Sequence, residues 1–179
     1  RFVAVGNVAM VSEDGYTWRR YEWFSRRLRR LASDGSRWVA IGDDGTVAVS
    51  PDGESWAVSV LTTERWGLWA VTWAGDRFVV STGLGSLYHS PTGSAWERVE
   101  PDLPVGDLAF GSGTLVTARH NRVSWSTDLE HWTLALEGFR EGADDVKYAT
   151  ALRQRATRVL AAGPEGRKAK AQASLDWLE

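Results

Sequence analysis

The sequence predicts an all-β protein, a β-propeller of about five blades in which each blade is a four-stranded antiparallel sheet. The first observation is a turn motif, with a serine and a tryptophan six residues apart, that recurs along the chain. The second is the spacing of the copies, about 40 residues, which is typical of propeller blades. The third is a hydrophobic period of two almost throughout, which indicates strands rather than helical repeats. The complete copies are Ser12–Trp18, Ser50–Trp56, Ser90–Trp96 and Ser126–Trp132.

The best-formed copy of the motif is SPDGESW, at Ser50–Trp56. Asp52 can fold its carboxylate onto backbone N–H groups two residues on, and Gly53 accepts a positive φ without strain. Residues before and after the turn alternate in polarity, which predicts two flanking strands. We therefore expect a hairpin with a large aromatic residue at the start of its second strand. A degraded fifth copy, SLDW, ends at Trp177.

Each unit is predicted to contain an inner strand, a second strand, a third strand, the motif turn and an outer strand. The inner strands are expected to begin near Leu28, Leu68, Val105 and Val146. The second strands are expected to begin near Arg1, Arg37, Arg77, Thr114 and Arg158. We expect a single propeller domain over residues 1–179, with blade units at about 1–24, 25–66, 67–104, 105–143 and 144–179.

The two end units differ from the others. No inner strand precedes Arg1, and the last unit stops at Glu179 without room for a full outer strand. These ends suit either a piece of a longer propeller of six or seven blades or a five-bladed ring whose termini share one blade. The segment 166–179 has the composition of a helix, but its register with the other repeats favours a strand pair.

Composition narrows the function classes. The chain has 179 residues, of which 43% are hydrophobic, enough for one buried core, and no apolar run has the length of a membrane span. A net charge of −2 and a pI near 6.0 argue against a nucleic-acid-binding protein. With no cysteine there is no disulfide and no thiolate metal site, a composition compatible with any compartment.

Eleven tryptophans in this chain require a repeated packing position or a repeated stacking surface. The motif tryptophans are expected to pack as wedges between neighbouring blades. Trp66 and Trp69, next to Arg65, could form a stacking platform for a sugar ring. For Trp69 and Trp73, which sit in an inner strand, we expect core packing instead, whereas Trp66 suits the platform as well as it suits packing.

The motif resembles that of the Asp-box (BNR) propeller family, whose pattern marks the turn between the third and fourth strands of a blade. The nearest matches are SEDGYTW at Ser12–Trp18 and SPDGESW at Ser50–Trp56, a variant familiar in bacterial sialidase-like propellers. The resemblance implies a propeller over the whole chain. It implies no single activity, because the family includes sialidases, other glycosidases, photosystem assembly factors and sorting receptors.

Ligand-binding residues are expected on the face opposite the motif turns. In a propeller, the connections between blades and the turns between second and third strands gather there around the channel. The candidates are polar or aromatic residues of these loops: Arg26, Asp43, Asp44, Arg65, Trp66, Arg119, His120 and Arg122.

A basic and aromatic run, RRYEWFSRRLRR, covers Arg19–Arg30 and holds six arginines and three aromatic residues. Guanidinium groups bind carboxylates or phosphates bidentately and stack on rings, so the run suits an anionic ligand. The alternative is that the arginines alternate along two strands with their charged ends in solvent.

Catalysis has weaker support. Sialidase chemistry needs three arginines on the substrate carboxylate, a tyrosine nucleophile with a glutamate, and an acid/base residue. Arg65, Arg119, Glu137 and Tyr148 could fill these roles, but the family's Arg-Ile-Pro segment is missing. The histidines lack zinc-site spacing and no phosphate-binding glycine loop is present, so we expect no metal and no cofactor.

The sequence therefore favours a non-catalytic propeller that binds a glycan, an anionic ligand or a protein partner on its loop face. The alternatives are a sialidase-like glycoside hydrolase and a purely structural propeller segment of a larger protein.

Overall fold

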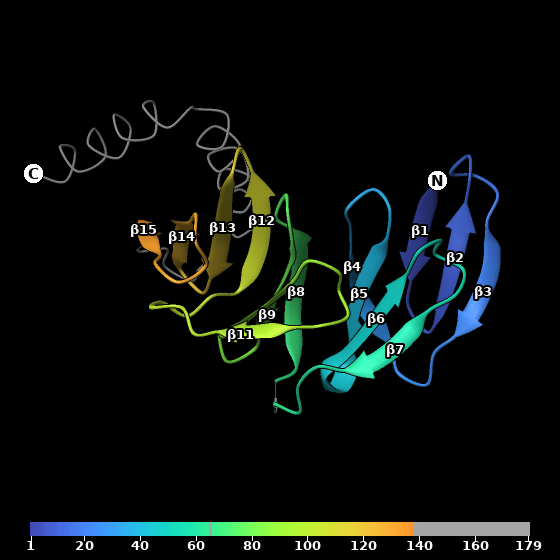
Figure 1. Ribbon diagram of the computed structural model, residues 1–179, viewed down its shortest axis with the longest axis horizontal. Helices are drawn as coiled ribbons and strands as arrows, with labels where there is room; N and C mark the ends of the chain where they lie inside the picture. The colour runs from blue at the N-terminus through green and yellow to red at the C-terminus, as the bar shows by residue number, and fades with distance from the viewer. Residues whose placement is uncertain (65, 138–179) are drawn as a thin grey trace, which may run out of the picture.

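A computed structural model describes residues 1–64 and 66–137, and it confirms the all-β propeller class (Figure 1). The described residues form fifteen strands in four antiparallel sheets. Sheet 1 contains β1 (Phe2–Val5), β2 (Val8–Ser12) and β3 (Arg19–Trp23). Sheet 2 contains β4 (Leu28–Ser33), β5 (Trp38–Gly42), β6 (Thr46–Ser50) and β7 (Ala57–Val60).

The remaining two sheets have the same plan. Sheet 3 contains β8 (Leu68–Trp73), β9 (Phe78–Thr82), β10 (Leu87–Ser90) and β11 (Glu97–Val99). Sheet 4 contains β12 (Asp107–Gly111), β13 (Thr114–Arg119), β14 (Arg122–Ser126) and β15 (Thr133–Glu137). A 3₁₀ turn, η1 (Asp43–Gly45), joins β5 to β6.

Neighbouring strands in each sheet are also neighbours in sequence. The inner strands β4, β8 and β12 lie side by side from one sheet to the next (Figure 1). In sheet 1, β1 pairs with β2 as β5 pairs with β6, and the described residues hold no inner strand for this sheet. No helix in the described ranges is long and apolar enough to cross a membrane. The fifth unit, 144–179, lies outside the described residues.

The four motif turns, which we call the repeat turns, have a common hydrogen-bond pattern. In the second, Asp52 Oδ1 accepts the N–H groups of Glu54 at 2.8 Å and Ser55 at 3.0 Å. Ser50 Oγ accepts the N–H of Gly53 at 2.7 Å, and Trp56 Nε1 donates to the Gly53 carbonyl at 3.0 Å. The predicted turn is therefore confirmed.

Equivalent bonds set the charge state of the aspartates. In the first repeat turn, the N–H groups of Thr17 and Tyr16 and the Ser12 hydroxyl lower the pKa of Asp14 to about 2. In the fourth, the N–H and the ring of His131 lower the pKa of Asp128 to about 2. These carboxylates stay ionised because they accept hydrogen bonds as anions.

The repeat turns also fill the seams between sheets. A Cβ on Gly53 would lie 2.6 Å from Val3 of sheet 1, and one on Gly93 would lie 2.6 Å from Val39 of sheet 2. In the fourth turn, Leu129 takes the glycine position with φ 76° and packs into the core between sheets 3 and 4.

Trp56, Trp96 and Trp132 pack in these seams, as predicted, whereas Trp18 of the first repeat turn is exposed. Trp56 meets Phe24 edge to face, with ring centroids 6.0 Å apart, and Trp132 is buried between sheets 3 and 4. Trp73 packs on Phe78 at 4.7 Å and adjoins the core between sheets 2 and 3, which confirms its structural role. Trp177 lies outside the described residues.

Candidate functional site

The candidate site is the loop face, which we define as the inner-strand starts, the connections between sheets and the turns between second and third strands. Backbone hydrogen bonds tie these segments together. The Leu28 N–H donates to Gly6 O at 2.9 Å, Asp43 N–H to Arg27 O at 3.0 Å, and Gly83 N–H to Gly67 O at 3.0 Å. Each bond joins a connection to a turn, so the surface is held in place before any ligand arrives.

Glycines allow the connections to lie directly on the turns. A Cβ on Gly45 would lie 1.7 Å from the Thr62 carbonyl oxygen, and a Cβ on Gly83 would lie 2.2 Å from Cβ of Trp66. Trp66 is therefore fixed at its base against Gly83, while 61% of its surface stays exposed. This placement favours the loop-platform interpretation over core packing.

Two inner strands begin with a β-bulge. In sheet 2, Leu28 pairs with Gly42 and Arg30 with Ile41, so Arg29 has no opposite residue on β5. In sheet 3, Leu68 pairs with Thr82 and Ala70 with Ser81, so Trp69 has no opposite residue on β9. A bulge redirects the side chain that it carries.

The bulge in sheet 3 turns Trp69 out of the core. Half of its surface is exposed, so the prediction that Trp69 packs in the core is wrong. The residue occurs in an inner strand of apolar composition, and only the register shift between Leu68 and Ala70 explains its exposure.

Three arginines of the basic run, Arg26, Arg29 and Arg30, form ion pairs with aspartates. The first two bind the aspartates of the turn between β5 and β6. Arg29 binds the Asp43 carboxylate, and Arg26 Nε lies 3.7 Å from Asp44 Oδ2. Asp43 and Asp44 belong to η1, in which Asp44 adopts a φ of 53°. The structure thus brings Arg26, Asp43 and Asp44 together, as the sequence indicated, and adds Arg29.

Arg30 reaches across all three complete inner strands. Its Nε donates to the Trp69 carbonyl at 3.3 Å, and its Nη2 lies 3.5 Å from Asp107 Oδ1 of β12. Ala70, almost fully buried, occupies the position of β8 that corresponds to Arg30 and Asp107, and a residue of this size leaves room for the crossing. Both charged side chains remain largely exposed.

The remaining candidates lie around the turn between β13 and β14. Arg119 donates from Nη1 to Val105 O at 2.7 Å and from Nη2 to Gly83 O at 2.9 Å, so it joins the turns of sheets 3 and 4. His120, exposed with a φ of 50°, and Arg122, also exposed, complete this turn. Arg65 lies outside the described residues, as does Tyr148.

Sequence reasoning missed Asp107 as a member of this surface and preferred core packing to a platform for Trp69. It included Arg29 and Arg30 only as part of the basic run. One signal was available. When the repeats are aligned, Arg29 corresponds to Trp69, and Arg30 to Asp107, at the starts of inner strands. In sheets 2, 3 and 4 these positions lie where the inner strand begins at the loop face.

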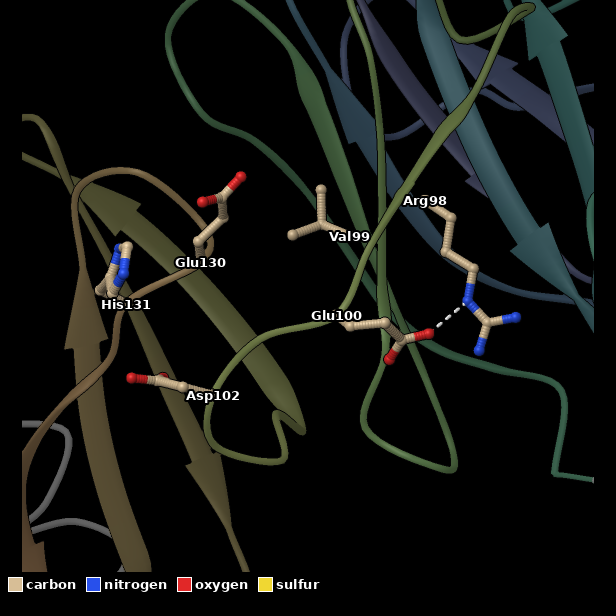
Figure 2. Close-up of a pocket in the computed structure, with 6 residues that line it drawn as sticks. All are labelled: Arg98, Val99, Glu100, Asp102, Glu130 and His131. Atoms are coloured by element: carbon tan, nitrogen blue, oxygen red, sulfur yellow. Dashed lines mark hydrogen bonds and ion pairs between the residues drawn. The ribbon is translucent and has the colours of Figure 1, made fainter.

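Apart from the loop face, a hollow lies at the rim, where sheets 3 and 4 meet (Figure 2). We call it the rim groove. Its volume is about 360 Å³, and its lining residues are Arg98, Val99, Glu100, Asp102, Glu130 and His131.

Most polar groups of the rim groove have structural partners. Arg98 donates to Glu100 at 2.5 Å, a contact that Figure 2 marks with a dashed line. Asp102 accepts the N–H of Trp132 at 2.9 Å. His131 lies 3.1 Å from Asp128, and this carboxylate raises the pKa of the imidazole. Within the described ranges, no group of three or more His, Asp or Glu residues could hold a metal ion.

No protein-family model matches the sequence, and no curated protein matches it. Solved β-propellers are similar in structure. YCF48 bound to D1 peptide has 19% identity over 75% of this chain and 49% of that chain, with a TM-score of 0.59. YCF48 from Cyanidioschyzon merolae has 16% identity over 76% of this chain and 52% of that chain, with a TM-score of 0.57.

Virginiamycin B lyase from Staphylococcus aureus is another such propeller. It has 10% identity over 77% of this chain and 55% of that chain, with a TM-score of 0.65. The chain therefore spans about half the length of these structures. At these identities the similarity establishes the propeller fold alone.

Proposed function

We propose that this chain is a non-catalytic binding module whose loop face recognises a segment of a protein partner that carries acidic side chains. Trp66, Trp69 and the Arg26–Arg30 segment form the centre of the proposed surface. Arg119, His120 and Arg122 belong to its periphery, and Asp43 and Asp44 orient the arginines. Arg65, predicted for the same surface, lies outside the described residues.

The exposure of Trp66 and Trp69 is the observation that carries the proposal. Their exposed fractions are 61% and 50%, whereas Trp132 of the repeat turns is buried. Indole is a large apolar group, and burying it against a partner stabilises a complex by more than most other side chains do. Both tryptophans lie on the face where hydrogen bonds already hold the backbone in place.

The ion pairs of the loop face suit a partner with acidic groups. Pairs between exposed charges contribute little to folding stability, because water already solvates both charges. An arriving carboxylate can therefore take the place of Asp43 or Asp107 on Arg29 or Arg30 at small cost. Guanidinium groups bind carboxylates with two parallel hydrogen bonds, which gives direction to the contact.

The mixture of charges supports a polypeptide over a simple anion. Asp44, whose side chain is largely exposed, offers a carboxylate to a basic residue of the partner, within reach of the same arginines. The solved YCF48 structure with a D1 peptide is a propeller of similar fold in complex with a peptide. This likeness supports peptides as the first class of ligand to test.

The test uses a library of 12-residue peptides that differ in acidic content, with a glycan array as the competing ligand class. We expect acidic peptides to bind, and Trp69→Ala to lower the affinity of the strongest one about threefold to tenfold. Tyr16→Ala is the matched control, because Tyr16 is 92% exposed but lies in a repeat turn.

Two binding results and one activity result contradict the proposal. One binding result is selective binding on the glycan array without peptide binding, and the other is an equal loss of affinity for Trp69→Ala and Tyr16→Ala. Turnover of a fluorogenic sialoside that disappears on Tyr148→Phe would instead establish the hydrolase.

A further inference from the structure

The connection from sheet 2 to sheet 3, residues 61–67, contains a buried acidic side chain. Only 14% of the Glu64 side chain is exposed, although glutamate is seldom buried without a partner. In the part of the chain that the structure describes, neither carboxylate oxygen has a hydrogen-bond partner. A carboxylate in this position needs a compensating charge.

Arg98, on the outer strand β11, supplies that charge. Its Nη2 lies 3.3 Å from Glu64 Oε1, a distance that makes an ion pair between the connection and the sheet that follows it. Arg98 is itself oriented from its other side, because it donates to Glu100 at 2.5 Å and to Ser86 Oγ at 3.2 Å. The guanidinium also lies 5.9 Å from the Tyr88 ring.

The backbone links this ion pair to Trp66. The Glu64 N–H donates to Thr62 Oγ1 at 3.2 Å, and the Glu64 carbonyl accepts the N–H of Gly67 at 2.9 Å. Trp66 lies inside the turn that the second bond closes. A displacement of Glu64 therefore changes the position of the indole on the loop face.

We propose that the Glu64–Arg98 pair is a latch that holds the 61–67 connection and positions Trp66 for binding. The effect on binding rests on the function proposed above, whereas the effect on the connection does not. Arg98 also lines the rim groove (Figure 2), so the latch joins two surfaces of the molecule. Glu64 and Arg98 are positioning residues, since neither is required to touch the partner.

The first test measures the connection without any ligand. Hydrogen exchange of the 61–70 segment and the ¹⁹F NMR signal of 5-fluorotryptophan, assigned with Trp66→Phe, report on it directly. Arg98→Gln leaves the Glu64 carboxylate uncompensated, so we expect exchange to accelerate about tenfold or more. Arg98→Lys keeps the charge and should preserve slow exchange.

A double variant makes the test specific. In Glu64→Gln/Arg98→Gln the uncompensated charge is gone, and we expect exchange to return most of the way to the wild-type rate. Glu100→Gln is the control, because it removes the exposed partner of Arg98 and leaves Glu64 in place. Equal acceleration in Glu100→Gln and Arg98→Gln, or no recovery in the double variant, would overturn the latch.

The second test measures the affinity of the strongest library peptide for the same variants. We expect a loss in Arg98→Gln that the double variant restores. If the connection loosens as expected and affinity does not change, the latch stands and the placement of binding at Trp66 is wrong. The two proposals therefore fail through different measurements.

Discussion

Asp52 shows how one side chain fixes a turn in this protein. Its carboxylate accepts two backbone N–H groups and is contacted by the Ser50 hydroxyl, which lowers its pKa. Thr92 occupies the corresponding position in the third repeat turn, where its hydroxyl accepts only the Ser94 N–H, at 3.3 Å. The two turns therefore form a natural comparison between a carboxylate and a hydroxyl.

This comparison gives a prediction for stability. Asp52→Ala should lower the free energy of unfolding by about 1 kcal/mol, because two N–H groups lose their acceptor. Thr92→Asp should raise it by about 0.5 kcal/mol, since the new carboxylate reaches two N–H groups. Urea unfolding measures both changes. The loss in Asp52→Ala and the gain in Thr92→Asp need not be equal in size. A Thr92→Asp variant less stable than the wild type would contradict the role given to the aspartates.

The lowered pKa values also predict how stability depends on pH. Asp14 and Asp128 have pKa values of about 2 in the folded protein and near 3.8 when unfolded. Their contribution is therefore complete above pH 3.8 and is lost as the pH falls toward 2. We expect the urea midpoint to fall over this range, and to fall less in Asp14→Asn/Asp128→Asn. An equal pH dependence in both proteins would refute this assignment.

At the scale of elements, the inner strands and the connections present the binding surface. Bulges at Arg29 and Trp69 turn these side chains toward solvent, and the glycines of the turns support the connections from below. Gly83 is the clearest case, since Trp66 Cβ occupies the space that a side chain at position 83 would need.

Gly83→Ala should therefore displace Trp66. A Cβ at 2.2 Å from another carbon forces a shift, and we expect a loss of about 1–3 kcal/mol in stability together with weaker peptide binding. Gly6→Ala is the control, because the space around Gly6, in a turn of sheet 1, is open. The ¹⁹F signal of Trp66 checks the result, and an unchanged signal in Gly83→Ala would contradict this packing.

The repeated elements could be predicted from the sequence because their causes are local. The Ser50–Trp56 turn depends on contacts within seven residues, and its recurrence sets the length of the blades. For Trp69 the sequence could not decide between a platform and core packing, because its exposure depends on a register shift against β9. The Arg30–Asp107 pair joins sheets 2 and 4, and the Glu64–Arg98 pair joins a connection to an outer strand, so no local pattern indicates them.

At the scale of the whole molecule, the repeat turns and the loop face have separate tasks. The turns pack into the seams and join successive sheets through Gly53, Gly93 and Leu129. The loop face leaves tryptophans and arginines exposed on a backbone that is already hydrogen-bonded. This division assigns stability to one set of residues and binding to another.

Hydrogen exchange with and without the strongest library peptide tests this division most directly. We predict that the peptide slows exchange in residues 24–30, 43–45 and 61–70, while the repeat turns exchange at the same rate in both states. Protection confined to the repeat turns or to the rim groove, with no change on the loop face, would contradict the account.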